Sequence, residues 1–132
     1  MNTAIAHALV AAAEAEATRG GFAVSITVLD AAAHPVAFLR MNGGAIGPAE
    51  VSLKKARTAA LFQADSAVLG AAAQPGGAIY SLEHTHGGLI SFGGGVVVRD
   101  AAGVVIGAIG VAGATVEADE TIAQVAAASL HA

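Results

Sequence analysis

The chain has 132 residues, no cysteine and a formal net charge of −4, and 55% of its residues are hydrophobic while 12% are charged. The lack of cysteine excludes disulfides, thiolate catalysis and zinc–sulfur sites, and the few scattered basic residues argue against a nucleic-acid-binding surface. The length is that of one domain, residues 1–132. So apolar a chain with so few charges predicts a homo-oligomer, because self-association removes poorly solvated surface from water.

The N-terminal half predicts a helix, a strand hairpin and two more helices. Residues 3–18 are rich in alanine, which favours a helix, and Gly20-Gly21 ends it. Apolar and polar residues alternate over 22–30, which predicts a strand that pairs with a second one over 36–41. Pro48 suits the first position of a helix that runs to Gln63. A shorter helix, capped by Asp65 or Ser66, is predicted to end near Ala72.

The C-terminal half predicts an irregular stretch, a second hairpin and a closing helix. Residues 74–88 hold two Gly-Gly pairs and Pro75, and they favour loops. Strands are predicted over 89–99 and 104–112, and Gly93-Gly94-Gly95 indicates a bulge or a close backbone approach in the first of them. Residues 115–132 predict a helix with acidic residues in its first turn.

Three further expectations concern the chain as a whole. No apolar run reaches the length of a membrane span, and the N-terminus lacks the basic region of a signal peptide. We therefore expect a soluble cytoplasmic protein without membrane or nucleic-acid partners. The few aromatic residues are expected to anchor the core: Phe22, Phe38, Phe62, Tyr80 and Phe92.

Lys55 is the first candidate functional residue. Helical spacing puts it on one face with Val51, Ala59 and Phe62. A lysine among apolar residues can anchor a substrate carboxylate or act as a catalytic amine. The alternative is a lysine whose stem covers apolar surface while its ammonium reaches water.

The second candidates are His84 and His86. Two residues apart in an extended segment, their rings would lie on one side of the chain, where they could ligate a metal or haem iron, or act as general base. The alternative is a polar loop that happens to contain histidine. His7, on the first helix, could face a neighbour or a cofactor, and His34 is expected at the surface.

Three stretches together resemble a known family. They are Val28-Leu29-Asp30 leading to Phe38-Leu39-Arg40-Met41, then Lys55-Ala56-Arg57-Thr58-Ala59, then Gly107-Ala108-Ile109-Gly110-Val111. In this order they resemble the GlcG-like family, which includes haem-binding HbpS and the C-terminal domain of PduO-type adenosyltransferases. The resemblance implies an α+β fold, profilin-like, with a five-stranded antiparallel sheet flanked by helices, assembled into oligomers.

The resemblance also implies a ligand site, and the chain departs from the family's pattern near it. The implied ligand-binding residues are Arg40, Asn42, Lys55, Thr58, His84, His86, Gly94 and Gly95. Asn42 stands where the family usually has aspartate, Val97 where it has proline and Ala112 where it has serine. A carboxylate and a hydroxyl are thereby absent from the expected pocket edge.

Two hypotheses for function follow. The first is a binding protein that holds haem, a related tetrapyrrole or another small anionic ligand at an oligomer interface, with His84 or His86 on the iron. The alternative is an isomerase or lyase for a small oxygenated organic acid. In that enzyme Lys55 would anchor the carboxylate, and His84 or His86 would transfer a proton.

Overall fold

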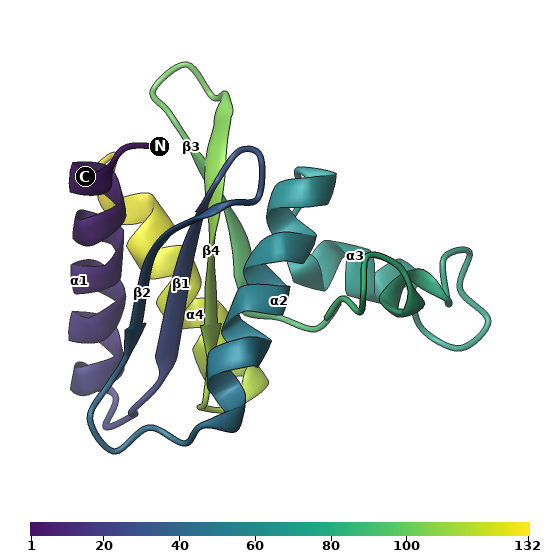
Figure 1. Cartoon of the computed structure of the whole chain (residues 1–132), viewed down its shortest axis with the longest axis horizontal. Coiled ribbons are helices and arrows are strands. Elements are labelled where there is room, and N and C mark those ends of the chain that lie inside the picture. The colour runs from purple at the N-terminus through teal and green to yellow at the C-terminus, as the bar shows by residue number, and fades with distance from the viewer.

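The computed structural model describes residues 1–132 as an antiparallel sheet with helices on both faces (Figure 1). The strands are β1 (Ser25–Asp30), β2 (Pro35–Arg40), β3 (Gly95–Arg99) and β4 (Val105–Ala112). Their order in the sheet is β2-β1-β4-β3, and every neighbouring pair is antiparallel. The predicted α+β fold is confirmed, but the sheet has four strands where five were expected. No segment between Phe62 and Gly95 forms a further strand, because turns and short helices fill that stretch.

Helices cover the two faces of the sheet unequally. The helices are α1 (Thr3–Arg19), α2 (Gly47–Phe62), α3 (Ser66–Ala72), α4 (Val116–Ser129) and the 3-10 helix η1 (Leu82–His84). Helices α1 and α4 pack side by side on one face, and α2 packs on the other (Figure 1). The strand predicted to begin at Leu89 begins at Gly95, because the glycine run precedes the ladder. None of the helices is both long enough and apolar enough to span a bilayer.

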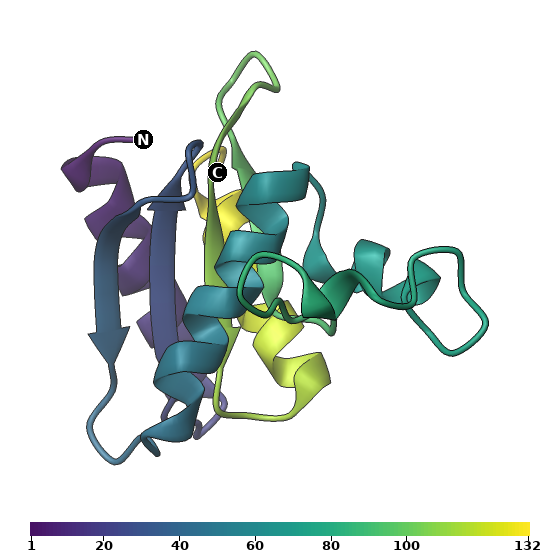
Figure 2. The ribbon, with the colours of Figure 1, turned by 45° about the vertical axis from the view of Figure 1, so that its right-hand side comes forward.

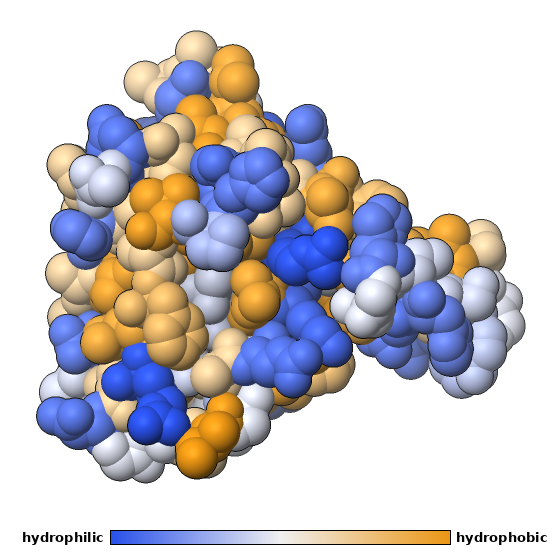
Figure 3. Space-filling model, in the orientation of Figure 1, coloured by the Kyte–Doolittle hydropathy of each residue, from blue (hydrophilic) through white to orange (hydrophobic).

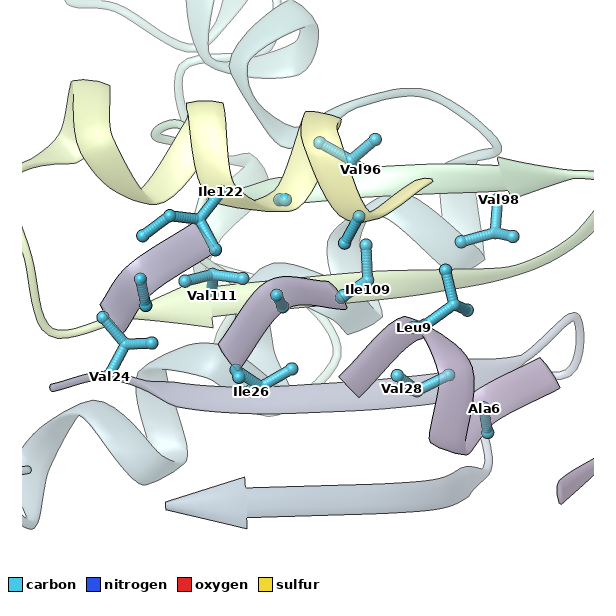
Figure 4. Packing of buried hydrophobic residues seen from close by; sticks show 14 residues of the cluster. Ala6, Leu9, Val24, Ile26, Val28, Val96, Val98, Ile109, Val111 and Ile122 are labelled. Atoms are coloured by element: carbon cyan, nitrogen blue, oxygen red, sulfur yellow. The ribbon is translucent and has the colours of Figure 1, made fainter. Parts of the chain in front are cut away.

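The larger core lies between the sheet and α1 with α4, and it consists of alanine, valine, leucine and isoleucine (Figure 4). Strand alternation divides β1 between the two faces. Ile26 and Val28 enter this core, whereas Thr27 faces α2 and shares a hydrogen bond of 2.8 Å with Ser52. A smaller cluster lies under α2 and is made largely of alanine. These small side chains let α2 approach the sheet closely, and a Cβ at Gly110 would lie 2.0 Å from the Ser52 carbonyl oxygen.

The aromatic residues lie outside both cores, so the prediction that they anchor the core is wrong. Their exposed fractions are 36% for Phe22, 52% for Phe38, 38% for Phe62, 58% for Tyr80 and 46% for Phe92. The physical reason is the close spacing of the layers: aliphatic strand residues and alanine-rich helices fill the interior and leave no room for rings.

Residues 66–92 form a projection from this body, which we call the arm. The arm contains α3, η1 and the turns between α2 and β3. Figure 2 shows it extending away from the sheet on the side of α2, and Figure 3 shows it as a separate lobe. The two ends of the arm meet where the Ser91 carbonyl passes Gly70, so closely that a Cβ on Gly70 would lie 1.7 Å from that oxygen.

Candidate functional site

Lys55 lies in the middle of α2 and is only 1% exposed. Its Nζ donates to the Val111 carbonyl oxygen at 2.9 Å and to Asp119 Oδ2 at 3.0 Å. Asp119 is itself 3% exposed, and its Oδ1 accepts a hydrogen bond from the Ala114 N–H at 2.9 Å. The ion pair therefore ties α2 to β4 and to the first turn of α4. A buried charge needs such partners, and here the protein itself supplies them.

Glycines make room for the lysine. Gly94 has a φ of +123°, and a Cβ there would lie 2.7 Å from Lys55 Nζ and 2.5 Å from the Val111 carbonyl oxygen. A Cβ on Gly95 would lie 2.2 Å from the Lys55 carbonyl oxygen. The close backbone approach predicted for the glycine run is thereby confirmed.

The N–H groups of these glycines are already used within the protein. Gly94 donates to Glu120 Oε1 at 2.9 Å, and Gly95 donates to Ser66 Oγ at 2.9 Å. Gly94 and Gly95, two of the implied ligand-binding residues, therefore have no free N–H group to donate to a ligand.

Phe92 covers Lys55 on the side of the arm. Lys55 Nζ lies 5.0 Å from the centroid of the Phe92 ring, within the range of a cation–π contact. A cavity of about 410 Å³ lies beside this ring, between α3 and residues 80–93. Thr58, one turn along α2 from Lys55, is also buried. Its Oγ1 donates to the Ile90 carbonyl oxygen at 2.7 Å. Lys55 and Thr58 thus hold the segment that leads from the arm into β3.

The two histidines lie at the surface of the arm. His84 closes η1, and His86 has a φ of +54°, so the segment is not extended. The extended segment that the prediction for the two rings assumed is therefore not present. The His86 ring packs edge-on against Phe62 with centroids 5.6 Å apart, and its Nδ1 lies 2.8 Å from Thr85 Oγ1. Arg57 Nη1 donates to the His86 carbonyl oxygen at 3.0 Å, which fixes this turn to α2.

The structure divides the predicted ligand-binding residues into separate groups. Lys55, Thr58, Gly94 and Gly95 meet between α2 and the start of β3. Arg40 ends β2, at the opposite edge of the sheet from β3, and Asn42 follows in an exposed loop. Three strand spacings separate those edges, which is roughly 14 Å. His7 lies in a separate depression of about 350 Å³ between α1 and β2.

The sequence analysis missed Asp119 as the partner of Lys55, and also Glu120 and Phe92. Asp119 stands in the first turn of α4, where the helix dipole alone accounts for an acidic residue. The sequence feature that could have indicated this partner was Lys55 itself, a lysine on an otherwise apolar helix face. A charge buried there requires a buried carboxylate from elsewhere in the chain. No three His, Cys, Asp or Glu side chains lie close enough together to hold a metal ion.

Comparison with known proteins places this arrangement in a family. Residues 1–128 match the family described as haem-degrading protein HbpS-like. The chain belongs to this HbpS-like family. It is 35% identical over 127 residues to the corrinoid adenosyltransferase PduO of Salmonella typhimurium, covering 95% of this chain and 37% of that protein. It thus spans little more than a third of that relative's length, and the same holds for PduO of Citrobacter freundii.

Solved structures agree with this HbpS-like assignment. Klebsiella pneumoniae protein ORFY has a TM-score of 0.95 and 34% identity, covering 100% of this chain and 91% of that one. A PduOC:heme complex has a TM-score of 0.91 and 33% identity, covering 98% and 94%. HbpS itself has a TM-score of 0.90 and 29% identity, covering 98% and 89%.

Proposed function

We propose that this HbpS-like chain is a binding protein for haem or a related tetrapyrrole, and that it works as a homo-oligomer. The family description and the haem in the PduOC complex support a haem ligand. Within this chain, the observation that carries the proposal is the exposed imidazole of His86. Its ring packs against the ring of Phe62, and Arg57 of α2 donates to its carbonyl oxygen.

His86 has the features of an axial iron ligand. The Thr85 hydroxyl lies at its Nδ1, so Nε2 remains the ring nitrogen available to iron. A hydrogen bond at the second ring nitrogen orients a ligating imidazole and fixes its tautomer. The side chain of His86 is exposed, so a planar macrocycle can approach it. His84, exposed two residues earlier, is the second candidate for the iron.

The surroundings of His86 suit the other parts of haem. Phe62 is 38% exposed and offers an apolar face to the porphyrin ring. Arg57 contacts the His86 turn, and Lys54 Nζ lies 3.3 Å from where a Cβ at Gly88 would stand. Both cations are therefore near the arm, and either can pair with a haem propionate. Lys55 takes no part in this site, because its ammonium is buried against Asp119.

The proposal of a homo-oligomer is based on the apolar side chains exposed at the surface of the chain. All five aromatic residues are at least 36% exposed, and aromatic side chains are enriched where proteins contact one another. An isomerase or lyase gains no comparable support. Its carboxylate anchor, Lys55, already donates to Asp119 and Val111.

A hemin titration followed by the Soret absorbance tests the proposal. We expect His86→Ala to weaken binding at least tenfold, or to abolish the Soret shift, and we expect His34→Ala to leave it unchanged. If only the His84→Ala, His86→Ala double variant loses the shift, His84 can replace His86 on the iron. An unchanged spectrum in the double variant would show that neither imidazole binds the iron.

A further inference from the structure

The cavity of about 410 Å³ between α3 and residues 80–93 is separate from the proposed iron ligands. Its wall includes two aromatic residues, Tyr80 and Phe92, and the carboxylate of Glu83, whereas neither His84 nor His86 lines it. Small-molecule sites occupy about 300–1,000 Å³ and combine apolar walls with a few polar groups. The cavity has both properties and is therefore a second candidate site on this chain.

The carboxylate of Glu83 is held in one position at the wall of the cavity. Its Oε2 accepts hydrogen bonds from the Ser91 N–H at 3.0 Å and from the Ser91 hydroxyl at 2.7 Å. No lysine or arginine forms an ion pair with Glu83, and its Oε1 accepts no hydrogen bond from the protein. One oxygen of an oriented carboxylate is therefore available to a donor on a ligand.

The charges around the cavity favour a cation. None of the residues that line it is a lysine or arginine. A second carboxylate, that of Glu120, lies behind the wall, since a Cβ on the lining residue Gly93 would be 3.6 Å from Glu120 Oε1. Glu120 forms no ion pair either. Lys55, the buried lysine of α2, adds no net positive charge, because Asp119 neutralises it. An anion would thus meet like charge in this cavity, and a cation would meet opposite charge.

The polar and aromatic groups together define the class of ligand. A carboxylate oxygen accepts an N–H, and a hydrogen bond between an ammonium and a carboxylate is stronger than one between neutral groups. Aromatic rings such as those of Tyr80 and Phe92 favour organic cations. A metal ion fits poorly, because no three His, Cys, Asp or Glu side chains come together. We propose that this cavity binds a small organic ammonium ion, with Glu83 as the acceptor and the two rings as walls.

Saturation-transfer NMR with benzylammonium as the probe tests the proposal. Benzylammonium carries an N–H-bearing cation beside an aromatic ring. Benzyl alcohol and benzoate have the same ring with a neutral or an anionic group, so they are the matched control ligands. The wild type should bind benzylammonium about tenfold more tightly than benzyl alcohol, as one charge-assisted hydrogen bond implies, and benzoate more weakly than either.

Three variants test where the probe binds. Glu83→Gln keeps the size of the side chain and removes its charge, so it should weaken benzylammonium binding about tenfold and leave benzyl alcohol binding unchanged. Ala71→Phe fills the cavity from an exposed position of α3 and should weaken binding of both ligands. Glu50→Gln is the control, because it removes an exposed carboxylate from the first turn of α2 and should change neither affinity.

The results that would overturn the proposal are distinct. Equal affinities for benzylammonium and benzyl alcohol would remove the preference for a cation. Equal losses in Glu83→Gln and Glu50→Gln would indicate attraction to the negative protein as a whole and not to this cavity. Unchanged binding in Ala71→Phe would place the probe elsewhere, and this result holds even if the circular dichroism spectrum shows that Glu83→Gln alters the fold.

Discussion

Lys55 Nζ lies 3.0 Å from Asp119 Oδ2, and neither side chain is more than 4% exposed. The pair links α2 on one face of the sheet to α4 on the other, past the end of β4. Both charges are therefore part of the packing between layers. Such a pair need not add net stability, but removing one partner strands the other charge in the interior.

We expect Lys55→Met to lower the free energy of unfolding by about 3–5 kcal/mol, because it leaves the Asp119 carboxylate buried without its cation. Lys54→Met is the control. Lys54 is half-buried, and its pair with the exposed Glu50 spans 3.4 Å, so that substitution should cost less than about 1 kcal/mol. Urea unfolding of both variants provides the measurement.

The double variant Lys55→Met, Asp119→Leu distinguishes a pair from two unrelated residues. If the charges act together, the double variant should be more stable than the sum of the two single changes implies, since no charge remains unpaired. Additive effects would contradict the assignment. A Lys55→Met protein as stable as the wild type would return Lys55 to the list of ligand-binding candidates.

Gly94→Ala tests the close approach of the glycine run to Lys55. The residue has a φ of +123°, and its Cβ would lie 2.5 Å from the Val111 carbonyl oxygen and 2.7 Å from Lys55 Nζ. Backbone strain of this kind alone costs about 1–3 kcal/mol, and the clash adds to it. Gly47→Ala is the matched control, because a Cβ there meets nothing within 4 Å. Thermal melts should show a large loss for Gly94→Ala and little change for Gly47→Ala.

Local sequence patterns were sufficient for most of the fold. The alternation over β1, the alanine-rich run of α1 and the proline at the start of α2 are local features, so they can be recognised in the sequence itself. The position of the aromatic residues depends on the distance between layers, which the whole set of small side chains determines. Periodicity carries no information about that distance, and the aromatic core was predicted wrongly for this reason.

The candidate site was harder to predict because its partners are distant in sequence. Lys55 and Asp119 are 64 residues apart, and Asp119 already had a local explanation as a residue of the first helical turn. The histidine pair failed for a local reason: a 3-10 turn and a left-handed residue replaced the extended segment that the spacing assumed. Turns rich in glycine admit such conformations easily.

Ser25 and Ser66 are both buried but differ in hydrogen bonding. Ser25 Oγ has no partner, whereas Ser66 Oγ lies 2.7 Å from the Phe92 carbonyl oxygen and accepts from the Gly95 N–H at 2.9 Å. We expect Ser25→Ala to leave the free energy of unfolding unchanged or raise it by up to about 1 kcal/mol, because it removes an unsatisfied polar atom. Ser66→Ala should cost about 1–3 kcal/mol, since it strands a buried N–H. Equal losses in urea unfolding would contradict this reading.

Asp30, at the β1–β2 turn, is expected to make the free energy of unfolding fall in acid. Asp30 Oδ1 accepts hydrogen bonds from the backbone N–H groups of His34 and Ala32, each at 2.9 Å. The His34 bond is the larger cause that lowers the pKa of Asp30 below its usual value of 3.8, and the Ala32 bond adds to it. Because the folded pKa is the lower one, the carboxylate stabilises the fold fully above the unfolded pKa. The contribution is lost as the pH falls through the folded pKa.

Asp30→Ala measures that contribution. At pH 7 the variant should be less stable than the wild type by about 1–2 kcal/mol, toward the lower end for hydrogen bonds to a charged acceptor because Asp30 is only half-buried. The difference should hold down to about pH 5 and shrink below about pH 4, where the wild-type carboxyl also becomes protonated. Glu14→Ala is the control: Glu14 is exposed on α1, and its loss should cost less than about 0.5 kcal/mol. A difference between Asp30→Ala and the wild type that grows as the pH falls would show that the sign of the argument is wrong.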